Sequence, residues 1–591
     1  MLGSHTAVAC HIANTIGWLV VPSVEWLLTS CAHELVMLAA PVVADSGVLW
    51  PLEEARVTTV RAATFEVLRS CGMTTIFSNP GSTEVSFLTD LPEDIRFVLA
   101  LHEGSVVGMA TGWSIATGAL PLVVLHTTAG LGNAVGALAT ARVNRAPMVV
   151  LVGQQDRRHL ALEPFLAGQL RGLAGSYPVW VNEPVRAQDV PGAVARAWLE
   201  ARHGSGPALV IVPMDDWKAP IDKEATLAAP GALLRPSAVT ADAARELAAL
   251  IGRARSPALV VGAGADDQGT WDALVDLAER LNCPVWQEPF GARAGFPQDH
   301  RLFAGHLPAG RDRLRKALRP YDLVVVIGAP VFRQYPFEAG AFVAAGTRLA
   351  VVTADPAEAH RSPVELAILA PPALVCQQLA ELVPPRPQES NPDIRRGEPP
   401  PPPQPGETMR AAHVLAALAS RMPADTVLIE ETPSSRQDLQ ALIPARRPLG
   451  FLSAAMGGLG FALPAAIGVR MGRPDRPVVA VVGDGSSLYQ IQALWSAAHY
   501  ACGVLFIVLA NGRYAIMDRL AEAHGEGRAP WPDFEEVSVA GLAQALGCPA
   551  IRVEKYEVLT ALLDETLPAL ADRKEPLLVE VAVPPDPTFQ L

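Results

Sequence analysis

The sequence predicts an α/β protein with three doubly wound domains, each built on a parallel sheet. The chain has 591 residues, which is long enough for several domains at roughly 150 residues each. Short apolar runs alternate with segments of helical spacing along most of it. That alternation is typical of parallel strands buried on both faces and joined by crossover helices. Half of the residues are hydrophobic, at 50%, so large buried cores can form.

The chain begins with an apolar extension that has no Lys or Arg before Arg56. A secretory signal needs a basic beginning, and a membrane-spanning helix needs about 20 mostly apolar residues in a row. Pro22, Glu25 and Glu34 interrupt this stretch. We therefore expect residues 1–56 to be a poorly ordered extension, and membrane association is the less favoured alternative.

Three α/β domains are expected after this extension. The first covers residues 57–236, with the buried runs TTIFSN, FVLAL, PLVVL, APMVVLVG and PALVIVP. The second covers residues 237–383, where the helical segment ADAARELAALIGRA precedes the runs PALVV, LVVVI and LAVVT. Residues 384–407 are too rich in proline to pack and form a predicted linker. The third domain, residues 408–591, contains PVVAVVGDG, then SSLYQIQALWSAAHYA as one helix, then VLFIVLAN.

Charge and cysteine content narrow the class of protein. The formal net charge is −13 and the isoelectric point is near 5.5. A nucleic-acid partner is therefore not expected, because such proteins carry basic patches. The seven cysteines show neither metal-site nor disulfide spacing. Reduced thiols of a cytoplasmic protein are the simplest interpretation.

Two oxygen-bearing side chains follow successive strands of the third domain. Asp484 is the aspartate of PVVAVVGDG, and Asn511 ends VLFIVLAN. In an open parallel sheet the carboxyl ends of the strands form the ligand-binding edge. Oxygen ligands beside a glycine turn and a helix N-terminus suit a hard divalent cation that holds a diphosphate. The alternative is a plain glycine turn, which is common in α/β proteins.

The GDG turn with this asparagine resembles the signature of thiamine-diphosphate enzymes. From residue 57 onward, longer segments resemble the benzoylformate decarboxylases within the 2-oxo-acid decarboxylase family: FSNPGSTEVSFLTDLPEDIRFVLALHE, VLHTTAGLGNAVGAL, VGQQDRRHLALEP, VVIGAPVFR, GGLGFALPAAIG and GDGSSLYQIQALWSAAHY. The resemblance implies pyrimidine-binding, middle and diphosphate-binding domains. It also implies thiamine diphosphate, Mg²⁺ and decarboxylation of an aryl or other bulky 2-oxo acid, as in the mandelate pathway of aromatic catabolism.

The resemblance also implies how the cofactor is held. Glu103 would hydrogen-bond the aminopyrimidine ring and so activate the cofactor; an isolated glutamate there would otherwise be only a favourable charge at a helix N-terminus. Leu459 would support the bent cofactor beside a glycine-rich turn that includes Gly457. The diphosphate would contact three further residues, namely Ser434, Gly485 and Ser486. The metal would be held by Asp484, Asn511 and the main-chain carbonyl of Arg513.

The substrate residues are likewise implied by the resemblance. Ser82 would bind the substrate carboxylate, and His126 would relay protons. Four side chains would wall an apolar pocket: Leu166, Ile516, Met517 and Leu520. Each of these has a purely structural alternative as a turn, core or packing residue.

Three positions depart from the benzoylformate decarboxylase pattern. Tyr335 stands where a second histidine is expected, and a tyrosine with a pKa of about 10 is a poor proton relay near neutrality. Pro433 replaces a hydroxyl residue near the diphosphate, and Ala510 replaces an asparagine before Asn511. The substrate side chain is left open by these changes.

Two other functions compete with decarboxylation. A carboligase of the acetolactate-synthase type, or an acyl-CoA lyase, would keep the cofactor, but such relatives generally lack a histidine at the place of His126. A non-catalytic binding protein of the same fold would not need Glu103, Asp484 and Asn511. Family members complete each site with residues from two subunits, which implies at least a homodimer and usually a homotetramer. No dinucleotide fingerprint is visible in the second domain, so nucleotide binding there stays open.

Overall fold

The computed structural model describes residues 58–221, 238–387, 398–525 and 529–585. The predicted extension, residues 1–56, lies outside these ranges, as does the middle of the predicted proline-rich linker. Within the described ranges, no helix combines the length and the apolar character that a membrane crossing requires.

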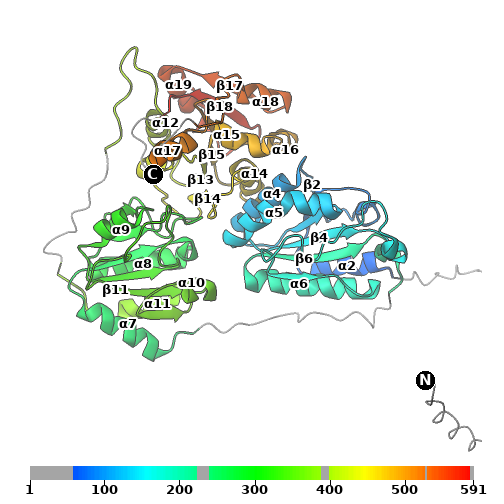
Figure 1. Ribbon diagram of the computed structural model, residues 1–591, viewed down its shortest axis with the longest axis horizontal. Coiled ribbons are helices and arrows are strands. Elements are labelled where there is room, and N and C mark those ends of the chain that lie inside the picture. The colour runs from blue at the N-terminus through cyan, green and yellow to red at the C-terminus, as the bar shows by residue number, and fades with distance from the viewer. Residues whose placement is uncertain (1–57, 222–237, 388–397, 526–528, 586–591) are drawn as a thin grey trace, which may run out of the picture. The chain divides into compact units, whose positions relative to one another are not determined.

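Three six-stranded parallel sheets follow one another along the chain (Figure 1). The first sheet has the order β2-β1-β3-β4-β6-β5. Its strands are β1 (Thr75–Asn79), β2 (Arg96–Leu99), β3 (Leu122–Leu125), β4 (Met148–Gln154), β5 (Trp180–Asn182) and β6 (Pro207–Pro213). Its helices are α2 (Val60–Ser70), α3 (Val85–Leu88), α4 (Glu103–Thr117), α5 (Thr127–Val143) and α6 (Val190–Gly204). All seven residues of β4 are buried, as expected for a strand covered on both faces.

The second sheet has the order β12-β11-β10-β7-β8-β9. Its strands are β7 (Pro257–Val261), β8 (Val285–Gln287), β9 (Phe303–His306), β10 (Leu323–Ile327), β11 (Arg348–Thr353) and β12 (Leu366–Leu369). Its helices are α7 (Ala241–Arg253), α8 (Gln268–Leu281), α9 (Arg311–Leu318), α10 (Pro356–His360) and α11 (Pro372–Leu382). The Thr240 hydroxyl caps α7 by accepting from the Ala243 amide, which explains where this helix begins.

The third sheet has the order β14-β13-β15-β16-β18-β17. Its strands are β13 (Val427–Glu431), β14 (Phe451–Ser453), β15 (Val478–Gly483), β16 (Leu505–Ala510), β17 (Ala550–Val553) and β18 (Leu577–Ala582). Its helices are α12 (Ala411–Ala419), α13 (Arg436–Leu442), α14 (Ala462–Gly472), α15 (Asp484–Ser487), α16 (Ala493–His499), α17 (Ala515–His524), α18 (Val539–Ala545) and α19 (Tyr556–Thr566). The predicted fold class, three doubly wound parallel-sheet domains, is confirmed.

Helices α4 and α14 join the first and third sheets through one hydrophobic core. Their approach depends on missing side chains, because a Cβ on Gly112 would lie 2.1 Å from the Ala465 carbonyl oxygen. A Cβ on Gly468 would likewise lie 1.9 Å from the Met109 carbonyl oxygen. These glycines therefore set the distance between the two domains.

The predicted single helix after the GDG turn is instead divided into pieces. Helix α15 is followed by a 3₁₀ turn at Leu488–Gln490 and then by α16. The Gln490 amide oxygen accepts a hydrogen bond of 2.6 Å from the Ser105 hydroxyl on α4. The tighter turn thus accompanies a contact between domains, which helical spacing in the sequence does not reveal.

Candidate active site

Three neighbouring strands of the first sheet end beside one another. Asn79 ends β1, Glu103 begins the helix after β2, and His126 follows β3 directly. Because the order β2-β1-β3 places these carboxyl ends together, the three side chains meet at one edge. The crossover direction reverses between β1 and β3, which is where such sheets bind ligands.

Glu103 is a buried carboxylate held from both sides by amides. Glu103 is 7% exposed. Asn79 donates to one oxygen at 3.2 Å, and Asn133 on α5 donates to the other at 3.1 Å. These two bonds fix the carboxylate plane, so Glu103 is a preorganised acceptor for a donor on a ligand.

His126 is oriented by its own carboxylate partner. Its Nδ1 lies 3.0 Å from Glu84 Oε2 and 3.0 Å from Thr83 Oγ1. Glu84 is 3% exposed and also accepts from the Gly81 amide at 2.8 Å. A carboxylate only accepts, so Nδ1–H donates to it and Nε2 is left to act on a ligand.

The turn after β1 packs tightly under this histidine. A Cβ on Gly81 would lie 2.3 Å from the His126 ring, so a glycine is required there. Ser82, the next residue, is exposed. The structure thus places Ser82, Glu103 and His126 just after neighbouring strands at one sheet edge.

Leu166 lies in a loop that is tied to the same edge. The side chain of Gln154, at the end of β4, donates to the Gly168 carbonyl at 2.7 Å and accepts from the Gly168 amide at 3.2 Å. A Cβ on Gly168 would lie 2.2 Å from the hydroxyl oxygen of Thr128 on α5. Leu166 is half-buried, two residues before this contact.

The third sheet carries a second cluster at its own carboxyl edge. Asp484 Oδ2 accepts from the amides of Asn511 and Gly512 at 2.8 and 2.7 Å. Asp484 Oδ1 accepts from the Gly485 amide at 2.7 Å. Burial raises the pKa of the Asp484 carboxyl, although these N–H donors oppose the shift. The aspartate therefore joins the ends of β15 and β16.

These residues fit a hard cation. The donors would be the Asp484 carboxylate, the Asn511 amide oxygen and the Arg513 carbonyl, all of them oxygens that Mg²⁺ accepts. Among the described residues, no donor to the Arg513 carbonyl is recorded, so this acceptor is open to an ion. The described ranges contain no group of three or more His, Cys, Asp and Glu side chains suited to a metal, so a metal here would depend on this mixed oxygen set.

The diphosphate-binding residues predicted from the sequence lie around the same turn. Ser486 is 6% exposed within the first turn after β15. Gly485 leaves space for the ring of Tyr514, whose Cε1 would lie 2.7 Å from an added Cβ. Ser434 is half-buried after β13, the strand that pairs with β15.

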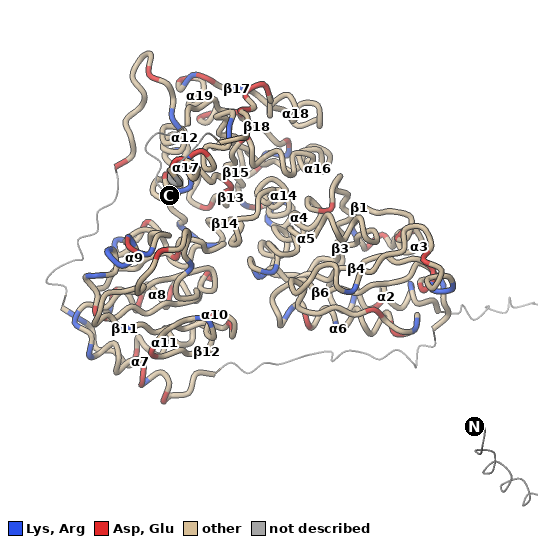
Figure 2. Tube along the Cα trace, viewed as in Figure 1, with Lys and Arg blue, Asp and Glu red and all other residues tan. Residues whose placement is uncertain are grey.

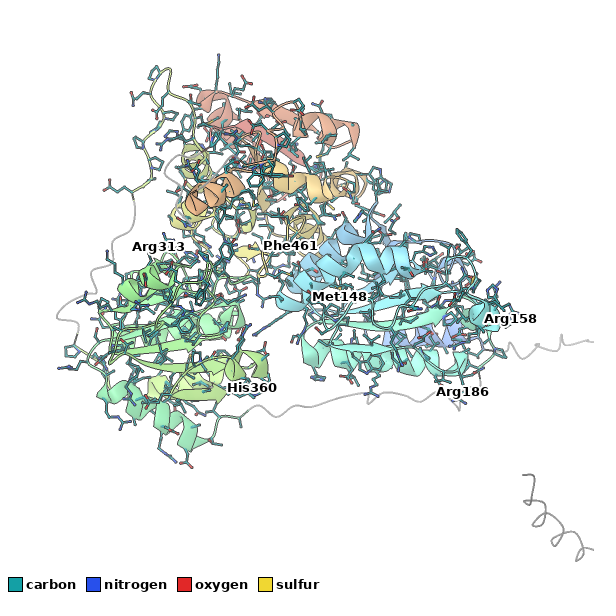
Figure 3. The ribbon with its side chains drawn as sticks, in the orientation of Figure 1. Met148, Arg158, Arg186, Arg313, His360 and Phe461 are labelled. Atoms are coloured by element: carbon teal, nitrogen blue, oxygen red, sulfur yellow. The ribbon has the colours of Figure 1, made fainter. Side chains whose placement is uncertain are left out.

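The glycine-rich turn before α14 is shaped by a buried glutamate. Gly457 and Gly460 have φ angles of +72° and +88°, which other residues rarely adopt. Glu431, at the end of β13, accepts from the amides of Gly460, Phe461 and Ala462 at 2.6, 2.8 and 2.7 Å. Phe461 is labelled in Figure 3. Between the two glycines, Leu459 is 37% exposed, available to contact a ligand.

Glu431 was not predicted from the sequence, and neither were the side chains that orient Glu103 and His126. Glu431 lies in the segment EETPSSRQ, where two adjacent glutamates at a strand end were the available signal. Asn79, Glu84 and Asn133 flank predicted residues, but their contacts depend on the order of the strands. Motif spacing does not supply that order.

The remaining pocket residues come from two other places. Ile516, Met517 and Leu520 lie on α17, just after the Asn511 turn, and Met517 is 41% exposed. Tyr335 follows β10 in the second domain and is 54% exposed. Within the described residues, no recorded hydrogen bond or ion pair links Glu103 or His126 to these residues or to Asp484. The sequence-predicted residues thus lie on three different parts of the chain: the edges of the first and third sheets and, for Tyr335, the second domain.

Three family models match the chain in sequence order. The thiamine pyrophosphate enzyme N-terminal TPP binding domain matches residues 58–172, the central domain residues 244–379, and the C-terminal TPP binding domain residues 434–581. The first and last of these contain the two clusters described above.

Several known proteins are similar over nearly their whole length. Benzoylformate decarboxylase of Pseudomonas aeruginosa is 38% identical, over 88% of this chain and 98% of its own. Acetolactate synthase large subunit of Corynebacterium glutamicum is 27% identical, over 86% and 84%. The structure of 4-hydroxybenzoylformate decarboxylase from Rhodococcus jostii superimposes with a TM-score of 0.83 at 35% identity, covering 90% of this chain and 100% of that one. Benzoylformate decarboxylase from Polynucleobacter necessarius gives 0.84 at 34% identity, covering 90% and 99%.

Proposed function

The chain belongs to the thiamine pyrophosphate enzymes, and on that premise we propose that it decarboxylates a 2-oxo acid with an aryl or other bulky side chain to an aldehyde and CO₂. The observation that carries this proposal is the His126–Glu84 pair beside Glu103 at one sheet edge. Its cofactors are thiamine diphosphate and a divalent metal, typically Mg²⁺. Benzoylformate decarboxylases are nearer relatives than acetolactate synthases, which favours an aldehyde product over carboligation.

Thiamine diphosphate, when bound, supplies the electron sink that decarboxylation requires. Glu103 would exchange a proton with the aminopyrimidine ring, and the amides of Asn79 and Asn133 keep its carboxylate in place. The metal would be held by Asp484, Asn511 and the Arg513 carbonyl, and the diphosphate by Ser434, Gly485 and Ser486. Gly457 and Leu459 would support the cofactor.

His126 moves protons at its Nε2 atom. Glu84 accepts from Nδ1, which fixes the ring and its tautomer so that Nε2 is the atom presented to a ligand. Ser82 donates to the substrate carboxylate, and that interaction sets the keto carbon beside Nε2. The substrate side chain is enclosed, and water is excluded, by five residues: Leu166, Tyr335, Ile516, Met517 and Leu520.

We further propose that each site combines residues of two subunits, in a homodimer or homotetramer located in the cytoplasm. Four large side chains are exposed in one chain: Leu101 at 42%, Met456 at 43%, Leu459 at 37% and Tyr489 at 53%. Each lies close in sequence to a residue of one of the two clusters, so we infer that a second copy of the chain covers them. The five described cysteines are free thiols, which suits a reducing compartment. A place in mandelate catabolism would follow from an aryl substrate.

Replacement of Glu103 by Gln tests the proposal. The purified enzyme, with thiamine diphosphate and Mg²⁺, is incubated with benzoylformate, pyruvate and branched 2-oxo acids while CO₂ and aldehyde are followed. We expect benzoylformate to be turned over and Glu103→Gln to lose nearly all activity, because the amide cannot exchange the proton. Cofactor binding, measured by calorimetry, should persist in this variant. Unchanged turnover in Glu103→Gln would refute the role of this carboxylate, and acetolactate from pyruvate without aldehyde would favour the carboligase.

A further inference from the structure

A cavity of about 620 Å³ lies between the second and third sheets. Its walls come from the residues after β8 and β9 and from α13, and they include Tyr335 and Ile516. Because these two residues are proposed to enclose the substrate, the cavity continues the substrate pocket. Pro433, the neighbour of Ser434, also lines it, so the cavity borders the proposed diphosphate site, although neither Leu459 nor Asp484 is part of its wall. Its volume is in the range of pockets that hold drug-sized ligands, which leaves room beyond an aryl ring.

The charged side chains that line this cavity are basic. Arg313 and Arg436 line it, and none of its lining residues is Asp or Glu. Arg313 lies on α9, where Figure 3 labels it and where Figure 2 shows basic residues gathered. His306 also lines the cavity, and burial lowers its pKa to about 3. The histidine is therefore neutral near pH 7, and the charged lining residues are the two arginines.

Arg436 is incompletely satisfied within the protein. Its nearest anion is Glu430, with Nε at 3.5 Å from Oε2, beyond the usual length of such a bond. Glu430 already accepts from the Thr432 amide at 2.7 Å and from the Ser453 hydroxyl at 2.9 Å. Arg436 Nε and Nη2 are buried with no hydrogen-bond partner recorded in the described structure. Buried donor atoms without a partner cost stability unless a ligand accepts from them.

We propose that Arg436 is a specificity-determining residue that selects 2-oxo acids whose side chain ends in a carboxylate. The inference rests on the proposed decarboxylation and names the substrate class of that site. The keto acid end lies at Ser82 and His126, the ring lies against Ile516 and Tyr335, and the distal carboxylate meets Arg436. Arg313 adds to the field without a contact of its own.

The test compares three substrates of the holoenzyme: benzoylformate, 4-methylbenzoylformate and 4-carboxybenzoylformate. The methyl compound controls for size, and the carboxyl compound adds the charge. We expect kcat/KM for the carboxyl compound to exceed that for the methyl compound about tenfold or more, since a hydrogen bond to a charged group is worth that factor. Arg436→Gln should remove this preference, and Arg436→Lys should keep part of it. Arg421→Gln, on a surface pair with Asp564, is the matched control and should change nothing.

An inhibition measurement on the unmodified enzyme tests the proposal even if the variants misfold. In the unmodified holoenzyme, terephthalate should inhibit benzoylformate turnover competitively and more strongly than benzoate. Equal inhibition by the two acids, or a carboxylate preference that survives in Arg436→Gln, would overturn the proposal. If no substrate released CO₂, the decarboxylation itself would fail. Tighter calorimetric binding of terephthalate than benzoate would then still support Arg436 as a carboxylate site, and equal binding would overturn it.

Discussion

At the scale of single residues, the most consequential groups are buried carboxylates at strand ends. Glu84, Glu103, Glu431 and Asp484 each follow a strand or a tight turn, and each accepts from groups that fix its position. Three of them orient another group: Glu84 the His126 imidazole, Glu431 the turn before α14, and Asp484 the loop after β16. Only Glu103 and Asp484 were recognisable from motifs, because the other two act through partners distant in the sequence.

Glu431 is expected to make stability depend on pH. Burial raises the pKa of the Glu431 carboxyl to about 7, against three N–H donors that oppose the shift. The folded protein then binds this proton more tightly than the unfolded chain does, so its contribution is greatest in acid and declines as the pH rises from about 4.5 to about 7. The shift corresponds to a loss of about 3 kcal/mol at most across that window.

Melting temperatures at pH 5 and pH 8 check this expectation. Between these values the wild-type melting temperature should fall more than that of Glu431→Gln, which has no proton to lose. The exposed Glu557 supplies the control, because Glu557→Gln should keep the wild-type pH dependence. An equal fall in wild type and Glu431→Gln would mean that the carboxyl titrates alike in the folded and unfolded chains.

At the scale of elements, the strands were predictable and the joints between domains were not. Runs such as PVVAVVG and VLFIVLA became β15 and β16 because a fully apolar run fits a strand buried on both faces. The helix predicted after the GDG turn is divided where Gln490 accepts a hydrogen bond from Ser105 on another domain. Helical spacing predicts one element at a time, so it does not predict contacts between elements.

The close crossing of α4 and α14 can be tested at Gly112. Gly112→Ala would place a Cβ 2.1 Å from a main-chain oxygen of α14, and a backbone atom cannot move aside alone. We expect a loss of about 1 to 3 kcal/mol in unfolding free energy, together with lower kcat, since Glu103 begins the same helix. The matched control is Gly252→Ala on α7, where an added Cβ meets nothing within 4 Å and stability should be equal or higher. Denaturant unfolding and turnover measure both effects, and a fully stable, active Gly112→Ala would contradict the packing argument.

At the scale of the whole molecule, the sequence was sufficient for the fold class and the cofactor, while the cofactor residues stay predictions. The family signature points to Glu103 and Asp484 because both motifs are local, and the structure places each at the carboxyl edge of its sheet. In the proposed shared site those edges meet across two chains, about which spacing within one chain says nothing. Arg436 illustrates the same limit, since its environment is assembled from the second and third domains.

Mixing two inactive variants tests the shared site directly. Glu103→Gln and Asp484→Asn should each be inactive as homo-oligomers, the first because proton exchange is lost and the second because the metal is lost. In a mixed dimer one site would carry both changes and the other would carry neither. Random pairing makes half of the dimers mixed, so co-expression should restore about a quarter of wild-type activity if each isologous pair holds two equivalent sites. If both groups of a site belonged to one chain, every site would carry a change and the co-expressed mixture would stay inactive. Co-expression of Glu103→Gln with His126→Ala, whose residues lie at the same edge, is the matched control and should restore nothing.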